Sequence, residues 1–216
     1  MSTRDSAVVF VHGLWLNGVE STLLRRRLAA DLDCATHAFH YPSVTASMTE
    51  IVERLAAFLA RLDVRTLHLV GHSLGGIVLL RLFEQAPPTQ PGRIVLLGSP
   101  VRGSRAAHRV ARWPFGAAIL GRSIEAEVLQ APRREWQGPR ELGVIAGDLS
   151  LGLGRLFGDL GGPNDGTVSV GETELPGATD RIVLPVSHTG VLFSSEAARQ
   201  TAGFLATGRF IAAGAA

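Results

Sequence analysis

The sequence contains no lysine and only one cysteine, and these scarcities exclude several kinds of protein. All 21 basic residues are arginines scattered along 216 residues, and the formal net charge is only +2. Nucleic-acid binding needs a concentrated basic stripe, which this scatter does not provide. Cys34 has no partner for an internal disulfide, and a single cysteine cannot build a multi-cysteine zinc site. We therefore expect no nucleic-acid partner and no disulfide scaffold. The sequence also has no histidine–carboxylate cluster at metal-ligand spacing, and its glycine-rich turns match neither nucleotide-binding pattern, so we expect no metal or organic cofactor.

The sequence also lacks a long apolar run. No stretch of about 18 apolar residues is free of charge, so we expect no membrane span. The first residues, MSTRDSAVVFVHG, do not have the order of a secretory signal, which favours a cytoplasmic protein. Hydrophobic residues make up 46% and charged residues 19% of the chain, enough for a sizeable core. The length predicts a single domain over residues 1–216.

Short apolar runs alternate with longer segments of helical periodicity along the chain. The apolar runs show no polar alternation, as expected for strands that are covered on both faces. We predict strands at 7–11, 36–41, 67–70, 93–97, 142–146 and 181–185, and helices at 19–31, 45–62, 74–86 and 189–206. This order predicts a three-layer α/β fold, with a mostly parallel six-stranded sheet between two layers of helices.

One predicted junction between a strand and a helix carries the pattern Gly-x-Ser-x-Gly, in residues 70–76 (VGHSLGG). A sharp turn at this point forces Ser73 into a strained backbone conformation and lifts its hydroxyl clear of the sheet. Side chains two positions before and after the serine would collide with neighbouring backbone, which accounts for Gly71 and Gly75. The alternative is a serine that only caps the helix between packing glycines. We predict that Ser73 is a nucleophile.

A serine hydroxyl is a weak nucleophile at neutral pH and needs a general base. Two histidines follow Ser73 in the chain, His108 and His188. His188 comes directly after the sixth predicted strand, whereas His108 lies in an amphipathic stretch typical of a surface. We therefore predict His188 as the base. We expect His12 to brace its loop by hydrogen bonds, and His72 to pack or bond locally.

The base needs an acid that orients it, and several carboxylates lie between the nucleophile and the base. Asp148, Asp159 and Asp165 all follow the fifth predicted strand. Asp165 lies in an Asn-Asp-Gly turn, where backbone amides can hold a carboxylate, although the same pattern also fits a plain turn. We favour Asp165, with Asp148 as the main alternative and Glu172 and Glu174 as more remote ones.

Acyl transfer also needs hydrogen-bond donors for the oxygen that becomes negatively charged. The amide of Leu74 lies at the start of the helix after the serine, where the helix dipole favours negative charge. Gly13 lets the loop after the first strand bend toward the nucleophile, so the amide of Leu14 can point inward. We predict Leu14 and Leu74 as the oxyanion hole, and Gly13 and Trp15 as substrate-binding residues.

Five stretches of the chain resemble the α/β-hydrolase superfamily, and more closely its small bacterial lipases and esterases. They are VVFVHGLW (8–15), LHLVGHSLGGIVLL (67–80), IVLLGSPVRGS (94–104), PNDGTVSV (163–170) and VSHTGVLFS (186–194). The resemblance implies a minimal form of the fold that lacks the first two strands. It also implies Ser73, Asp165 and His188 as nucleophile, acid and base. The chain departs from the family pattern at 147–162, where glycine-rich sequence precedes the expected acid.

These residues predict a serine hydrolase that cleaves carboxylic esters through an acyl-enzyme. The fold alone cannot separate this activity from that of a thioesterase, amidase, phospholipase or acyltransferase, or from a non-catalytic binding protein. Segment 102–141 is expected to form a helical cap whose apolar face, with Trp113 and Phe115, receives the acyl chain. The alternative for this segment is a helical pair packed on the sheet edge. We expect a small uncharged ester with a short to medium acyl chain as substrate.

Overall fold

The computed structural model describes residues 5–121, 125–130, 132–151 and 160–212. In this part of the chain six strands form one sheet in the order β2-β1-β3-β4-β5-β6, and every neighbouring pair is parallel. The strands are β1 (Ser6–Val11), β2 (Ala35–Phe39), β3 (Thr66–His72), β4 (Ile94–Leu97), β5 (Leu142–Gly147) and β6 (Asp180–Leu184). The predicted six-stranded parallel sheet is confirmed.

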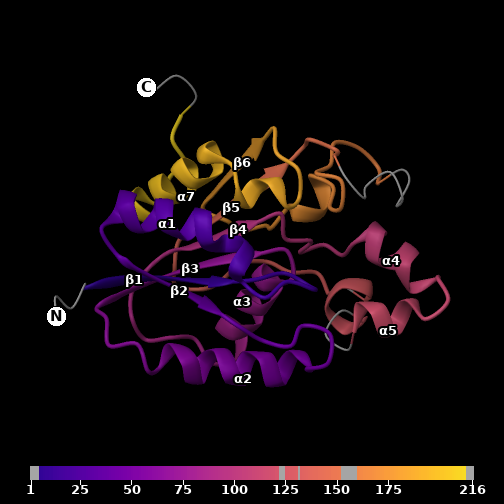
Figure 1. The fold of residues 1–216 in the computed structure, drawn as a ribbon, viewed down its shortest axis with the longest axis horizontal. Helices are drawn as coiled ribbons and strands as arrows, with labels where there is room; N and C mark the ends of the chain where they lie inside the picture. Colours follow the sequence, from indigo (N-terminus) through magenta and orange to yellow (C-terminus); the bar gives the residue numbers. More distant parts are fainter. Residues whose placement is uncertain (1–4, 122–124, 131, 152–159, 213–216) are drawn as a thin grey trace.

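Helices cover both faces of the sheet and produce the three predicted layers (Figure 1). The helices are α1 (Thr22–Leu32), α2 (Met48–Leu59), α3 (Leu74–Gln85), α4 (Arg105–Ala111), α5 (Gly116–Leu120) and α7 (Ser195–Thr207). Helices α1 and α7 pack together on one face, and α2 and α3 on the other. The short helices α4 and α5 lie beyond the carboxyl ends of the strands. None of the described helices is long and apolar enough to cross a membrane.

Burial on both faces explains why the strands are continuous apolar runs in the sequence. In β1, Ala7, Val9 and Val11 belong to the apolar cluster beneath α2 and α3. Val8 and Phe10 of the same strand belong to the cluster beneath α1 and α7. Because successive side chains of a strand point to opposite faces, both sets are buried only when helices cover both sides.

The last helix begins later than predicted. A 3₁₀ turn at Gly190–Leu192 comes first, and α7 starts only at Ser195. The hydroxyl of Ser194 accepts a hydrogen bond from the amide of Ala197 at 3.1 Å, and its backbone is extended. Because the backbone of Ser194 is extended, the helix cannot continue through it, and serine is a preferred residue at this capping position.

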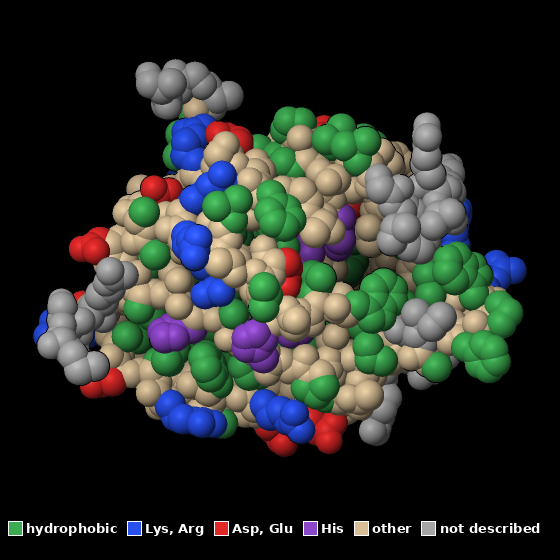
Figure 2. Space-filling view, viewed as in Figure 1, with side chains coloured by type: hydrophobic (Ala, Val, Ile, Leu, Met, Phe, Trp, Pro, Cys, Tyr) green, Lys and Arg blue, Asp and Glu red, His purple; other side chains and the backbone are tan. Residues whose placement is uncertain are grey.

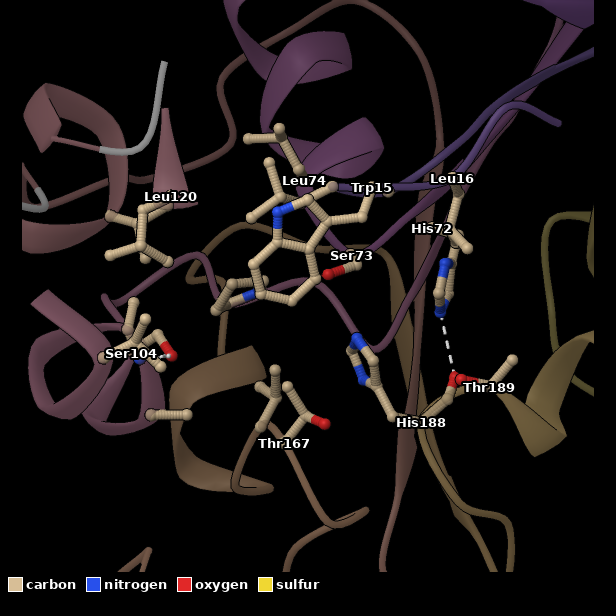
Figure 3. Close-up of a pocket in the computed structure, with 18 residues that line it drawn as sticks. Trp15, Leu16, His72, Ser73, Leu74, Ser104, Leu120, Thr167, His188 and Thr189 are labelled. Carbon is tan, nitrogen blue, oxygen red and sulfur yellow. Dashed lines mark hydrogen bonds between the residues drawn. The ribbon is translucent and has the colours of Figure 1, made fainter. Parts of the chain in front are cut away.

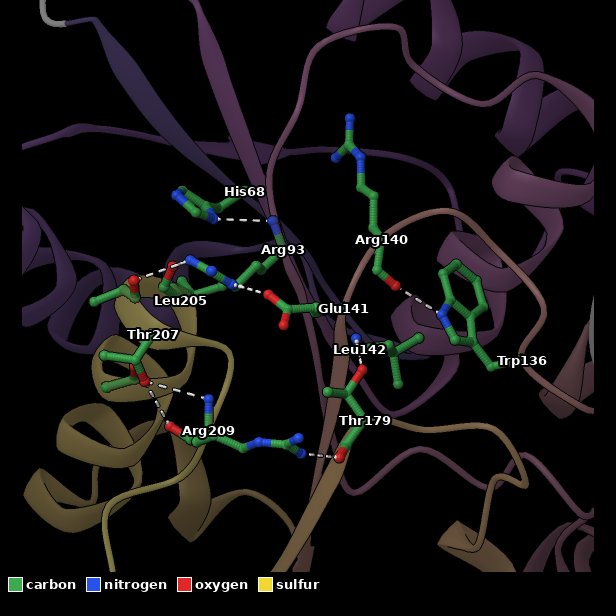
Figure 4. Close-up of polar contacts among 12 residues, drawn as sticks. His68, Arg93, Trp136, Arg140, Glu141, Leu142, Thr179, Leu205, Thr207 and Arg209 are labelled. Atoms are coloured by element: carbon green, nitrogen blue, oxygen red, sulfur yellow. Dashed lines mark hydrogen bonds and ion pairs between the residues drawn. The ribbon is translucent and has the colours of Figure 1, made fainter.

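Polar contacts tie the strands together at the amino end of the sheet (Figure 4). The amide of Arg93 donates to Nδ1 of His68 at 3.1 Å, and the Arg93 guanidinium pairs with Glu141 at 2.5 Å. The Trp136 indole donates to the carbonyl oxygen of Arg140 at 2.8 Å. The pocket that contains Ser73 and His188 lies at the opposite, carboxyl end of the sheet, where α4 and α5 are found.

Candidate active site

Ser73 occupies a strained turn between β3 and α3. Its φ of 53° and ψ of −120° lie in a region that residues other than glycine rarely adopt. A Cβ atom on Gly75 would collide with the carbonyl oxygen of Val11, and one on Gly71 would lie 2.7 Å from Gly76 Cα. Both glycines are therefore required by the close approach of backbone around the serine, as the sequence predicted.

Asp165 and His188 are joined by hydrogen bonds between the loops that follow β5 and β6. Nδ1 of His188 lies 2.7 Å from Oδ2 of Asp165, and the main-chain amide of His188 donates to the carbonyl oxygen of Asp165 at 2.8 Å. The other carboxylate oxygen, Oδ1, accepts from the amides of Thr167 at 2.9 Å and Val168 at 2.7 Å. Asp165 is 1% exposed. The buried carboxylate is thus held in one orientation, with one oxygen reserved for the imidazole.

Ser73 and His188 line the same pocket at the carboxyl end of the sheet (Figure 3). The imidazole of His188 lies beside the Ser73 hydroxyl in that view. Figure 2 shows the surface hollowed where histidine side chains reach it. The cavity has a volume of about 220 Å³, and its walls are mostly apolar. The structure therefore brings together a hydroxyl, an imidazole and a buried carboxylate at the end of an apolar pocket.

The loop after β1 passes directly over the serine. A Cβ atom on Gly13 would lie 3.1 Å from Cβ of Ser73, so only glycine allows this approach without displacement. Gly13, Leu14 and Trp15 all line the pocket, and Leu74 begins α3 on its other side. Within the described residues, the amides of Leu14 and Leu74 donate to no protein acceptor. Both donors are available to a ligand oxygen.

His12 braces this loop as predicted. Its Nδ1 lies 2.8 Å from the carbonyl oxygen of Gly13, and its Nε2 accepts from the amide of Tyr41 at 3.3 Å. The Tyr41 hydroxyl donates to the His12 carbonyl oxygen at 2.7 Å, and the two rings stack with centroids 4.1 Å apart. Burial lowers the pKa of His12 and keeps its ring neutral. Both ring nitrogens of His12 are therefore engaged in contacts that hold the loop.

The other carboxylates that were considered for the acid lie in surroundings different from those of Asp165. The side chain of Asp148 is exposed, and Glu174 forms an ion pair with an arginine. Glu172 accepts hydrogen bonds from two main-chain amides. Asp159 lies outside the described residues, and His108 is exposed on α4. Over the described ranges, no group of three or more metal-ligating side chains could hold a metal ion.

Segment 102–141 contributes different residues to the pocket from those predicted. Trp113 and Phe115 lie outside the pocket, at the turn between α4 and α5, and are 46% and 85% exposed. Small and branched side chains on the buried face of α4, and further residues from the same segment, line the pocket instead: Ala106, Ala107, Val110, Leu120 and Val128. Sequence reasoning did not single out Ala106 and Ala107, although both lie at helical spacing from Val110. The side chain of Ile119 and residues 122–124 and 131 lie outside the described part.

Several solved hydrolase structures are similar to this fold at low sequence identity. Lipase BlEst2 of Bacillus licheniformis, in its propeptide form, matches 99% of this chain with a TM-score of 0.74 and 20% identity. The metagenomic carboxyl esterase MGS0156 matches 87% of the chain with a TM-score of 0.62 and 18% identity. A pyrethroid hydrolase from Sphingobium faniae matches 94% of the chain and 98% of its own length, with a TM-score of 0.62 and 15% identity. This chain spans 52% of the lipase and 66% of the esterase.

The match to a protein-family model assigns the family of this chain more firmly than these structural similarities do. No curated protein matches the sequence significantly. The model of the alpha/beta hydrolase family matches residues 8–203, from the first strand to the last helix, and so includes the serine turn and both loops of the carboxylate–imidazole pair. The chain belongs to the alpha/beta hydrolase family.

Proposed function

We propose that this protein is a serine hydrolase that cleaves carboxylic esters. In this proposal Ser73 is the nucleophile, His188 is the general base and Asp165 orients the base. The observation that carries it is the 2.7 Å bond between His188 Nδ1 and Asp165 Oδ2, next to a strained serine in the same pocket. A hydroxyl, an imidazole and a buried carboxylate in this relation form the catalytic triad of acyl transfer.

The first step of the proposed reaction acylates the serine. The bond to Asp165 keeps the proton of neutral His188 on Nδ1, so Nε2 is free to accept the Ser73 proton as Oγ attacks the ester carbonyl carbon. The negative charge that develops on the carbonyl oxygen is stabilised by the amides of Leu14 and Leu74, each worth about 3 kcal/mol. The ester C–O bond then breaks, and His188 returns the proton to the leaving alcohol.

The second step hydrolyses the acyl-enzyme. A water molecule gives a proton to His188 and attacks the acyl carbon, and the same amides hold the second oxyanion. Collapse of this intermediate releases the acid, and the proton on His188 returns to the Ser73 oxygen. Asp165 stays ionised throughout and stabilises the imidazolium that forms in each step.

The pocket supports a small uncharged ester as substrate. Its volume of about 220 Å³ is below the roughly 300–1,000 Å³ of pockets for drug-sized ligands. Among the described residues that line it there is no Arg, Asp or Glu side chain. A charged acyl group would lose its hydration without gaining a partner, which is costly. A short to medium apolar acyl chain fits these walls.

We also propose that residues 1–216 form one domain in which segment 102–141 is a cap over the pocket. Leu120 of α5 lines the pocket from the side opposite Ser73 and His188 (Figure 3). Ala106 and Val110 of α4 line the same pocket. Covering the site in this way excludes water and strengthens the electrostatic interactions inside.

A panel of p-nitrophenyl esters of graded acyl length tests the proposed function. Wild type should hydrolyse acetate and butyrate esters and lose activity toward octanoate, and Ser73→Ala should have no measurable turnover while keeping the melting temperature of wild type. Ser99→Ala is a matched control, because Ser99 is buried near the site yet does not line the pocket. Turnover by purified Ser73→Ala would contradict the proposal. Faster cleavage of matched thioesters or amides would assign the same triad to one of those substrates.

A further inference from the structure

His72, the residue before the proposed nucleophile, makes a contact that the triad alone does not explain. Its side chain is 1% exposed. Nε2 lies 2.9 Å from the main-chain carbonyl oxygen of His188, and the two imidazole rings have centroids 4.9 Å apart (Figure 3). The hydrogen bond therefore links the segment that carries the nucleophile directly to the loop that carries the base.

The chemistry of this contact fixes the protonation of His72. A carbonyl oxygen only accepts hydrogen bonds, so the proton of His72 resides on Nε2. Its Nδ1 is buried and has no hydrogen-bond partner among the described residues. Burial and the nearby His188 lower the pKa of His72 to about 3. The charged or titratable groups that face it are His188 and His12, which disfavour a charge on the ring, and Asp165, which favours one. His72 is thus a neutral donor throughout the pH range of ester hydrolysis.

The base is held at three points. Its main-chain amide donates to the Asp165 carbonyl oxygen at 2.8 Å, and its Nδ1 bonds to the Asp165 carboxylate at 2.7 Å. Both of these contacts fix His188 relative to the acid. The third contact, from His72 Nε2 to the His188 carbonyl oxygen, fixes the base relative to the nucleophile.

We infer that His72 is a positioning residue that sets the distance between the nucleophile and the base, by donating its Nε2 proton to the carbonyl oxygen of His188. This inference rests on the proposed function of Ser73 and His188. Without the donor, the acid and base can move together away from the serine while their mutual hydrogen bonds remain intact. A misplacement of about 1 Å between reacting groups costs about 100-fold in rate. His72 also lines the pocket, but its Nε2 donates to the His188 carbonyl oxygen, so we expect ester binding to depend on the apolar walls and not on this hydrogen bond.

Two substitutions of His72 distinguish the effect of losing the hydrogen-bond donor from the effect of changing the side-chain volume. His72→Phe keeps a ring and removes the donor, whereas His72→Gln places an amide nitrogen the same number of bonds from Cα as Nε2 of histidine. His68→Asn is the matched control, because His68 lies on the same strand and its Nδ1 accepts from the amide of Arg93, a role that the asparagine oxygen can take over. The measurements are kcat and KM for p-nitrophenyl butyrate, the rate of labelling by a fluorophosphonate, and the melting temperature.

We expect His72→Phe to lower kcat by about 30- to 100-fold, with KM within about twofold of wild type. His72→Gln should recover kcat to within about fivefold of wild type, because it restores the donor. The fluorophosphonate labelling rates should follow the same order, and His68→Asn should match wild type in both measurements. A purely structural role would instead lower the melting temperature and leave the kcat of the folded enzyme unchanged.

Several results would overturn the inference. One is a kcat of His72→Phe within twofold of wild type, and another is a folded His72→Gln variant as slow as His72→Phe. If His72→Phe does not fold, His72→Asn replaces it, since its shorter amide cannot reach the carbonyl oxygen. Equal kcat values for the Gln and Asn variants would then overturn the inference. Absence of labelling in wild type itself would overturn the proposed function as well, so the two failures are distinguishable.

Discussion

Replacing Asp165 by asparagine should change the tautomer of His188, the proposed base, while leaving the shape of the site intact. Oδ1 of Asp165 accepts from the amides of Thr167 and Val168, and Oδ2 faces Nδ1 of His188 at 2.7 Å. An asparagine has one acceptor oxygen, and the two main-chain amides require it. Its NH₂ group must then occupy the Oδ2 position and donate toward His188. The imidazole can accept that donor only by moving its own proton to Nε2.

In this tautomer His188 cannot accept the serine proton. An amide that imposes the wrong tautomer on a triad histidine lowers kcat by about 10,000-fold. At about 1.36 kcal/mol per factor of ten, this loss corresponds to about 5.4 kcal/mol of transition-state stabilisation. KM should change little, because Asp165 does not line the pocket.

Steady-state hydrolysis of p-nitrophenyl butyrate, with circular dichroism as the check on folding, measures this effect. Asp148→Asn is the matched control, because Asp148 follows the same strand and its side chain is exposed. We expect its kcat to stay within about twofold of wild type. A folded Asp165→Asn variant with more than a tenth of the wild-type kcat would refute the reasoning, as would an equal loss in Asp148→Asn.

Three further predictions concern the pocket, the half-buried His68 and the glycines. Ala107 lines the pocket, so Ala107→Leu should lower kcat/KM for the hexanoate ester about tenfold more than for acetate, whereas the exposed Ala118→Leu should leave the chain-length profile unchanged. Burial lowers the pKa of His68 from 6.5 to about 4, so below pH 6.5 the unfolded chain binds a proton that the folded protein does not. The contribution of His68 to the free energy of unfolding is then fully present above pH 6.5 and decreases by about 3 kcal/mol on acidification to pH 4. Urea unfolding should show that the free energy of unfolding falls less between pH 6.5 and pH 4 in His68→Asn than in wild type. Equal decreases in the two proteins would contradict the lowered pKa of His68. A Cβ on Gly75 collides with β1, so Gly75→Ala should lower the free energy of unfolding by about 3 kcal/mol or more. A Cβ atom on Gly171 would meet open space, so Gly171→Ala should stay within about 0.5 kcal/mol of the wild-type free energy of unfolding. Similar free energies of unfolding for the two variants would show that the close approach of Gly75 to β1 is unimportant.

The sheet could be predicted from the sequence because its strands are buried on both faces. A run such as Ala7–Val11 has no polar alternation, which distinguishes a covered parallel strand from a half-exposed one. The helices were predicted from their apolar periodicity, but that signal does not mark a helix end. The start of α7 depends on Ser194, whose capping bond to Ala197 is a local choice that periodicity does not record.

The candidate site was predictable only where the chemistry is local in sequence. The turn around Ser73 is specified by neighbouring glycines, and His188 follows a recognisable strand. The choice of Asp165 over Asp148 depends on which carboxylate lies next to His188 in the folded chain, and sequence spacing does not determine that. Asp165 reaches His188 at 2.7 Å although the two residues belong to different loops.

The prediction that Trp113 and Phe115 line the pocket was wrong for a geometric reason. Aromatic side chains predict an apolar pocket lining, but the orientation of α4 decides which of its faces points inward. Phe115 follows a proline and has a φ of 62°, so the chain turns there and the ring faces solvent. The contact of His72 with His188 could not be predicted either, since it joins a side chain to a main-chain oxygen 116 positions away.

The most direct test of the central claim is the site of modification by a fluorophosphonate, determined by peptide mass spectrometry. The account predicts one stoichiometric adduct on the Ser73 hydroxyl, because only a serine activated by a base reacts readily with this reagent. The adduct should be absent from Ser73→Ala and strongly reduced in His188→Ala. An unmodified Ser73 in folded protein, or equal labelling of wild type and His188→Ala, would contradict the claim that His188 activates Ser73.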